Sequence, residues 1–141
     1  MNYILDTCVI SEMVKPSPHP KVLEWMGQQN EDVLYLSVLT IGEIQKGISR
    51  LPDNLKKTNL QSWLDIDLKS RFENRMLPID DEVSKTWGTI QAIAEKSGRK
   101  IPVIDSLIAA TGFVHQMVVV TRNIGDMPSL PGLTIFNPWE D

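Results

Sequence analysis

The sequence predicts a three-layer α/β/α sandwich on a mainly parallel sheet. Short apolar runs, typical of buried strands, alternate along the chain with segments whose apolar residues recur every three or four positions, as in amphipathic helices. The clearest strand, residues 117–120, contains three consecutive valines, as expected for a strand covered on both faces. This alternation favours a parallel sheet with helices packed on its two faces.

Each predicted element rests on a local pattern. Asp80 is placed to cap a helix that Gly98 ends, and Pro102 opens the helix after it. A Pro-Asp-Asn break at residues 52–54 separates two other helices. The predicted strands cover residues 3–5, 33–37, 76–79, 117–120 and 133–136. The predicted helices cover residues 22–26, 40–51, 55–72, 81–97 and 102–114.

Composition limits the classes of protein to consider. The 141 residues are 42% hydrophobic, which is enough for one domain, residues 1–141, with its own core. A single cysteine permits no intrachain disulfide, so we expect a cytoplasmic protein, and no apolar run approaches the ~20 residues of a membrane span. The net charge of −4 weakly opposes a nucleic-acid partner. A metal-dependent nuclease can still be acidic, because divalent cations supply positive charge at its site.

Acidic residues stand at the ends of predicted strands and at the starts of helices. Asp6 follows the first strand, at the edge where parallel sheets bind ligands, although it could simply cap a turn. Glu43 fits a capping box that begins at Thr40, yet it lies on a polar helix face with Lys46 and Arg50. Both acids therefore have a structural and a functional interpretation.

Asp105 is the acid whose surroundings are the most apolar. A carboxylate in the first turn of a helix is favoured by the helix dipole, which is its structural interpretation. However, the sequence from Ile101 to Ile108 is otherwise almost entirely apolar, and a buried carboxylate needs a partner such as a metal ion. Asn123 and Asp126 follow the strand that ends near Thr121, where both could equally be turn residues.

Five blocks of sequence, in this order, resemble a PIN-domain protein of the VapC/FitB toxin type over essentially the whole chain. They are Leu5-Asp6-Thr7-x-Val9-Ile10-Ser11-Glu12, Leu36-Ser37-x-x-Thr40-x-x-Glu43, Ile104-Asp105-x-Leu107-Ile108-Ala109-Ala110-Thr111, Val120-Thr121-Arg122-Asn123-x-x-Asp126 and Phe136-Asn137-Pro138-Trp139. The resemblance implies a Mg²⁺-dependent ribonuclease, with Mn²⁺ able to substitute, that acts as the toxin of a bacterial type II toxin–antitoxin pair. It also implies an antitoxin partner, an RNA substrate and a homodimer.

The resemblance further implies that Asp6, Glu43 and Asp105 form an acidic core. FitB-like members have an aspartate where Asn123 stands, whereas many VapC-like members have the asparagine and an aspartate three residues later, so we assign Asp126 as the fourth acid. Cys8 departs from the family pattern, which has Asn or Ser there.

We expect Asp6 and Asp105 to bind the metal directly and the other two acids to act through water. The candidate RNA contacts are Lys46, Arg50, Arg122 and Asn123, with ordinary surface positions as the alternative.

Two other classes of protein are alternatives. A phosphoryl-transfer hydrolase of the haloacid dehalogenase type needs a second aspartate two residues after Asp6, where this chain has Cys8. A PIN-fold module that only docks a partner does not need its acids, and this chain has an acid at all four positions.

Overall fold

The structure is a computed structural model that describes residues 1–140, in which five strands form one sheet in the order β3-β2-β1-β4-β5. Every neighbouring pair of strands is parallel. The strands are β1 (Tyr3–Leu5), β2 (Leu34–Ser37), β3 (Met76–Leu77), β4 (Val118–Val120) and β5 (Ile135–Phe136). All five predicted strands are therefore confirmed, with β3 and β5 shorter than expected.

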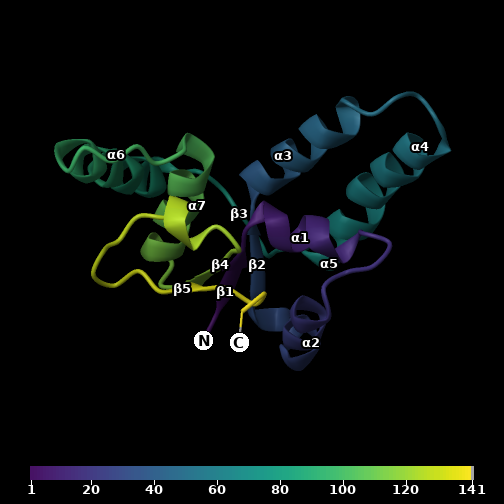
Figure 1. Ribbon diagram of the computed structural model, residues 1–141, viewed down its shortest axis with the longest axis horizontal. Coiled ribbons are helices and arrows are strands. Elements are labelled where there is room, and N and C mark those ends of the chain that lie inside the picture. Colours follow the sequence, from purple (N-terminus) through teal and green to yellow (C-terminus); the bar gives the residue numbers. More distant parts are fainter. Residues whose placement is uncertain (141) are drawn as a thin grey trace.

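Helices cover both faces of the sheet, which confirms the predicted sandwich (Figure 1). They are α1 (Thr7–Met13), α2 (Pro20–Gln28), α3 (Val38–Ser49), α4 (Leu55–Ser62), α5 (Lys69–Arg71), α6 (Asp81–Lys96) and α7 (Val103–Val114). Shorter helical segments are η1 (Glu31–Val33), η2 (Trp63–Leu68), which joins α4 to α5, and η3 (Ile124–Asp126).

Alternate residues along the strands pack into two separate parts of the core. Leu5 and Val120 pack with the helices from α1 to α4, whereas Ile4 and Val119 pack with Ile108 of α7. All of these side chains are buried. This period of two is the geometry of a strand covered on both faces, and it explains why the strands read as continuous apolar runs.

Two glycines allow close or unusual backbone geometry around α6 and α7. Gly98 has φ +71° and follows the last turn of α6, as the sequence predicts. A Cβ added at Gly112 would lie 2.6 Å from Cγ2 of Val119, so glycine lets α7 pack directly against β4.

The start of α3 differs from the prediction. The helix begins at Val38, and Ser37 caps it by accepting a hydrogen bond from the Leu39 N–H at 3.1 Å. Thr40 is fully buried inside the helix, so the expected capping box from Thr40 to Glu43 is wrong. Glu43 therefore lies in the helix interior, and this structural interpretation of its carboxylate no longer applies.

The helix α1 was missing from the predicted elements. It starts directly after Asp6, whose carboxylate accepts the Thr7 N–H at 2.8 Å as an N-cap. Asp80 likewise caps α6, as predicted, by accepting the Val83 N–H at 2.9 Å. In the part of the chain that the structure describes, no helix combines the length and apolar character needed to cross a membrane.

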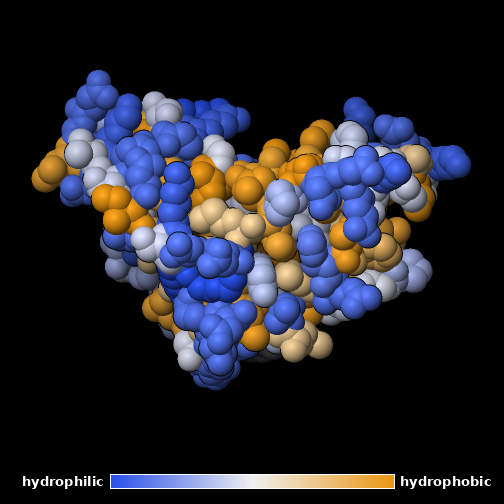
Figure 2. Space-filling view, turned by 180° about the vertical axis from the view of Figure 1, so that it is seen from behind, coloured by the Kyte–Doolittle hydropathy of each residue, from blue (hydrophilic) through white to orange (hydrophobic). Residues whose placement is uncertain are grey.

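The carboxyl ends of β1 and β4 lie between α7 on one side and α1 and α3 on the other (Figure 1). Seen from behind, the surface is hollowed between the part that contains α6 and the part that contains α3 and α4, and apolar side chains line some of this hollow (Figure 2). We call this hollow the cleft. Its position beyond the strand ends is where parallel α/β sheets place their ligands.

Candidate active site

Four acids from four different elements lie within electrostatic range of one another, because three of them act on the charge of Asp105. Asp6 ends β1, Glu43 lies on α3, Asp105 lies in the first turn of α7, and Asp126 belongs to η3. Along the chain, the successive separations between these acids are 37, 62 and 21 positions, so only the fold brings them together.

Asp6 is the most buried and the most firmly held of these carboxylates. It is 3% exposed, and Thr121 Oγ1 donates to its Oδ2 at 2.8 Å while the Thr7 N–H donates to its Oδ1. Cys8 Sγ also lies 3.8 Å from Oδ2. Burial raises the pKa of the Asp6 carboxyl above its ordinary value, and the hydrogen bonds from Thr121, Thr7 and Cys8 oppose that rise.

Glu43 is joined to the start of α1 by a side-chain hydrogen bond. Thr7 Oγ1 donates to Glu43 Oε1 at 2.5 Å and lies 3.2 Å from Thr40 Oγ1. Thr7 therefore contacts two acids, through its N–H to Asp6 and through its hydroxyl to Glu43. A short hydrogen bond to a charged acceptor orients the carboxylate toward the end of β1.

Asp105 has a very different environment. Within residues 1–140, no donor hydrogen-bonds its half-buried carboxylate. The pKa of Asp105 is raised to about 6, first by burial and then by the negative charges of Asp6, Asp126 and Glu43, in that order. These three charges act on Asp105 because their carboxylates lie within electrostatic range of it. Such mutual repulsion favours a bound cation or a proton.

The two candidates for the fourth acidic position have different contacts. Asp126 is exposed, and its charge acts on Asp105. Asn123 contributes backbone contacts: its N–H donates to Thr121 Oγ1 at 3.0 Å, and its carbonyl accepts the Asp126 N–H at 3.0 Å. Asn123 thus shapes the turn that presents Asp126.

The donor set fits a hard divalent cation. Carboxylate oxygens are the ligands that Mg²⁺ and Mn²⁺ prefer, and a carboxyl with a pKa near 6 is relieved by added positive charge. Among the described residues, no three His, Cys, Asp or Glu side chains are close enough together to hold one ion. The site therefore fits a cation that binds only one or two carboxylates directly and keeps several waters, as Mg²⁺ does.

The candidate RNA contacts lie around these acids without touching them. Lys46 and Arg50 are exposed on α3, one and two turns beyond Glu43, so that Arg50 is about 10 Å further along the helix axis. The Arg122 guanidinium lies over the ring of Trp139, 5.4 Å from its centroid, and Trp139 is buried. This contact places Arg122 beside the C-terminal segment that carries Trp139.

Sequence reasoning missed the residues that hold the acids. The hydroxyls of Thr7 and Thr121 bind Glu43 and Asp6, respectively, and both threonines stand inside the quoted sequence blocks without an assigned role. The signal available in the sequence was that Thr7 follows an acid and that Thr121 stands at the end of a strand. Which carboxylate each hydroxyl meets depends on contacts across 36 and 115 residues.

A second supporting cluster lies behind Asp105. The buried Ser106 hydroxyl accepts from Trp87 Nε1 at 3.0 Å and from Gln91 Nε2 at 2.7 Å, both on α6. Gln91 Nε2 also donates to the Ile101 carbonyl at 3.1 Å. Because Pro102 gives α7 no side-chain cap, these contacts from α6 hold the first turn of α7, which carries Asp105.

Comparison with known proteins identifies relatives of the whole chain. A family model described as PIN domain matches residues 3–127. The chain is 36% identical to VapC ribonuclease Y4jK of Sinorhizobium fredii, covering 97% of both proteins. It is 34% identical to toxin FitB of Neisseria gonorrhoeae, covering 98% of this chain and 99% of FitB. A solved structure of FitAB bound to the IR36 DNA fragment matches with a TM-score of 0.90 and 33% identity, covering 99% of this chain and 96% of that one.

Proposed function

This chain belongs to the PIN-domain family, and we propose that it is a divalent-metal-dependent endoribonuclease acting as the toxin of a bacterial toxin–antitoxin pair. The observation that supports the activity most strongly is the group of four acids, in which the charges of Asp6, Glu43 and Asp126 act on Asp105. Family membership favours this function over a phosphoryl-transfer hydrolase of the dehalogenase type, and the four acids favour it over a docking module without activity.

The reaction is hydrolysis of an RNA phosphodiester bond, in which water adds to phosphorus as one P–O bond breaks. Asp6 and Asp105 would hold Mg²⁺ or Mn²⁺ directly, while Glu43 and Asp126 would act through water. A bound divalent cation would lower the pKa of a coordinated water and would neutralise charge on the phosphate. The hydrogen bonds from Thr121 and Thr7 fix Asp6 before any ligand arrives, which reduces reorganisation at the site.

The cationic side chains around the cleft would position the RNA. Lys46, Arg50 and Arg122 are exposed and lie where a phosphate backbone could follow α3 and the cleft edge, and the Asn123 amide is a further donor. These contacts bind backbone and carry no sequence information. They provide local positive charge in a chain whose net charge of −4 otherwise repels a polyanion.

The partners follow from the family and from exposed apolar surface. A groove of about 250 Å³ opens beside Thr7 and Glu43 and continues between α1, α3 and α4 to Trp63, and we assign it to a segment of the cognate antitoxin. Leu23 of α2 and Leu55 and Ile66 of the α4–η2 segment are exposed, and we assign surface of this kind to a homodimer. Light scattering of the isolated toxin at micromolar concentration should give the dimer mass, and a monomer mass would refute the dimer.

The activity is tested with purified protein and single-stranded RNA. We expect cleavage with Mg²⁺ or Mn²⁺, none in excess EDTA, and recovery when the metal is added back. Asp6→Asn serves as the control for contaminating nucleases, because it should abolish cleavage in every buffer. Undiminished cleavage in EDTA by the wild type, absent in Asp6→Asn, would overturn the metal-dependent mechanism.

A further inference from the structure

Arg99 lies outside the acidic group, yet the end of α6 fixes its backbone firmly. The Gly98 N–H donates to the Glu95 carbonyl at 3.0 Å, and the Arg99 N–H donates to the Ala94 carbonyl at 2.9 Å. With Gly98 at φ +71°, these two hydrogen bonds form a Schellman motif, which sets the direction in which the chain leaves the helix. The side chain of Arg99 therefore starts from a rigid position.

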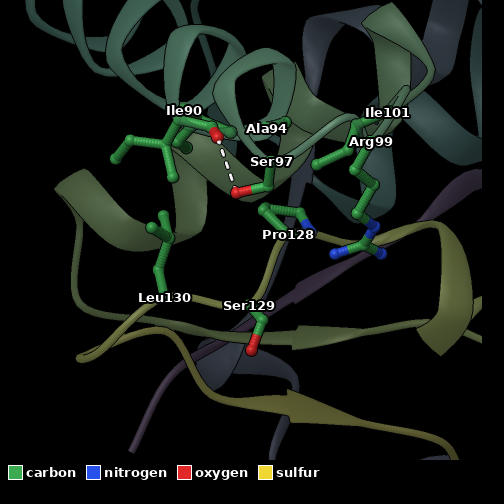
Figure 3. Close-up of a pocket in the computed structure, with 9 residues that line it drawn as sticks. Ile90, Ala94, Ser97, Arg99, Ile101, Pro128, Ser129 and Leu130 are labelled. Carbon is green, nitrogen blue, oxygen red and sulfur yellow. Dashed lines mark hydrogen bonds between the residues drawn. The ribbon is translucent and has the colours of Figure 1, made fainter.

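The guanidinium of Arg99 binds the two carbonyls that flank Asp126. Its Nη2 donates to the Gly125 carbonyl and to the Met127 carbonyl, each at 2.6 Å. Figure 3 shows the Arg99 side chain extending from the connection between α6 and α7 toward the loop that carries Pro128. Met127 is 2% exposed, so the far side of this turn is also fixed by packing in the core.

We propose that Arg99 is a positioning residue for Asp126: by holding the carbonyls on both sides of that residue, it fixes the turn that presents the Asp126 carboxylate to the cation site. This inference rests on the proposed function, since it concerns the same site. It adds a residue to which no role in the reaction has been assigned above.

The contacts of Asp126 itself explain why it needs such support. Within the described residues, no donor hydrogen-bonds its exposed carboxylate, whereas Asp6 receives several hydrogen bonds. The direction of the Asp126 side chain therefore depends on its backbone. That backbone is fixed by Asn123, whose carbonyl accepts the Asp126 N–H, and by Arg99. Groups that orient metal-binding acids commonly affect metal affinity by about tenfold or more.

Arg99 also connects two acids of the site. It lies four residues before Val103, where α7 begins and soon presents Asp105. Because the same short connection holds the turn of Asp126, Arg99 couples the position of η3 to the start of α7. Loss of Arg99 should therefore loosen one side of the cleft while leaving Asp6 and its hydrogen bonds in place.

The sign of the expected effect separates positioning from simple electrostatics. Removing a cation near a metal site should by itself strengthen metal binding slightly, because repulsion decreases. Removing a positioning residue should weaken it. Lys100→Met is the matched control, since it deletes the same charge one residue later from an exposed side chain.

The experiment is a calorimetric Mn²⁺ titration of the full chain as wild type, Arg99→Met, Asp126→Asn, the double variant and Lys100→Met. We expect Arg99→Met to weaken Mn²⁺ binding by up to about tenfold, and by no more than Asp126→Asn does, since Asp126 acts through water. We expect the double variant to bind like Asp126→Asn alone, because the effect of Arg99 passes through Asp126. Lys100→Met should retain or slightly exceed the wild-type affinity. Arg99→Lys should be intermediate, since lysine lacks the planar fork of arginine.

Wild-type Mn²⁺ affinity in Arg99→Met, or an equal loss in the presence and absence of Asp126, would overturn the inference while leaving the proposed function intact. Absence of Mn²⁺ binding by the wild type would instead overturn the proposed function and this inference with it. Thermal unfolding of each variant identifies a failure to fold. If Arg99→Met does not fold, Arg99→Lys alone and in the Asp126→Asn background provides the same comparison.

Discussion

Asp6 directly follows β1 and Asp105 lies in the first turn of α7, and their carboxylates are held in different ways. Asp6 is 3% exposed and accepts hydrogen bonds from the Thr121 hydroxyl and the Thr7 N–H. Asp105 is half-buried and, within residues 1–140, accepts none. Its turn is instead held from behind, through Ser106 and the side chains of α6.

The two acids differ in how far hydrogen bonds compensate the charge of the carboxylate. Hydrogen bonds to Asp6 oppose the rise in its pKa that burial causes, so this carboxylate is fixed with part of its charge compensated by the protein. Asp105 has no such compensation, and three neighbouring negative charges add to the effect of burial on its pKa. The Asp105 side of the cleft should therefore depend most on a bound cation.

The largest expected effect of a single substitution comes from Asp105→Asn. It should remove most of the Mn²⁺ affinity and abolish RNA cleavage, because it deletes the carboxylate whose charge is least compensated. If Asp105 only interacts with the helix dipole, the change should be nearly silent. Calorimetric titration beside a cleavage assay distinguishes these outcomes, and wild-type values for both would remove Asp105 from the site.

A smaller effect is expected when Asp6 loses its main support. Thr121→Val keeps the shape of the side chain but removes the donor to Asp6 Oδ2 and the acceptor of the Asn123 N–H. We expect a loss of about 1–3 kcal/mol in the free energy of unfolding and weaker Mn²⁺ binding. Denaturant unfolding and calorimetry measure the two quantities.

Thr7→Val is the matched comparison for Thr121→Val, because it removes the hydroxyl that donates to Glu43 and contacts Thr40, and it keeps the Thr7 N–H that binds Asp6. Its effect on metal affinity should be the smaller of the two. A larger effect at Thr7 would mean that Glu43, and not Asp6, dominates metal binding on this side of the cleft.

Loss of the contacts behind Asp105 should mainly lower the stability of the fold, with a smaller effect on metal affinity. Ser106→Ala leaves Trp87 Nε1 without its acceptor and removes one of the two acceptors of Gln91 Nε2. A buried donor without a partner costs about 1–3 kcal/mol, so the midpoint of denaturant unfolding should fall. Mn²⁺ affinity should decrease modestly as the first turn of α7 loosens. An unchanged unfolding midpoint would show that these contacts do not hold the turn.

The smallest effect is expected for Glu43→Gln. Glutamine keeps an oxygen that can accept the Thr7 hydroxyl, and an acid acting through water loses only an indirect contact with the metal. Mn²⁺ affinity should fall less than in Asp105→Asn, with slower but measurable RNA cleavage in single-turnover kinetics. Metal affinity as low as that of Asp105→Asn would make Glu43 a direct ligand.

The elements that position the acids were largely predictable from the sequence. Apolar runs and helical periodicity located the five strands and the helices around Asp105, because these elements are specified by the burial of one or both faces. The start of α3 was mispredicted because Ser37 and Thr40 are both acceptable caps, and only the end of β2 at Ser37 decides between them. The short helix α1 lacks a distinct stop signal before Met13 and was not predicted.

The supporting contacts of the site were not predictable in the same way. Thr121, Ser106 and Arg99 act through hydrogen bonds to residues that are 115, 15 to 19, and 26 to 28 positions away, respectively. No local pattern records such pairs. The choice of Asp126 over Asn123, in contrast, was made from the sequence pattern, and the charge of Asp126 acts on Asp105 in the structure.

The central claim is that repulsion among four neighbouring carboxylates favours binding of a cation. The pH dependence of stability without metal tests this claim most directly. With its pKa raised to about 6 from an ordinary value of 3.8, Asp105 binds more protons in the folded state, so its ionisation destabilises the fold as pH rises from about 4 to about 6. Below that window the wild type and Asp105→Asn should be similarly stable in EDTA, and above it Asp105→Asn should be the more stable.

Denaturant unfolding of both proteins from about pH 3 to about pH 7.5, in EDTA and then in Mn²⁺, measures this difference. We predict that Mn²⁺ reverses the order above pH 6 by stabilising the wild type far more than Asp105→Asn. Equal stability of the two proteins at every pH in EDTA, together with equal stabilisation by Mn²⁺, would contradict the account.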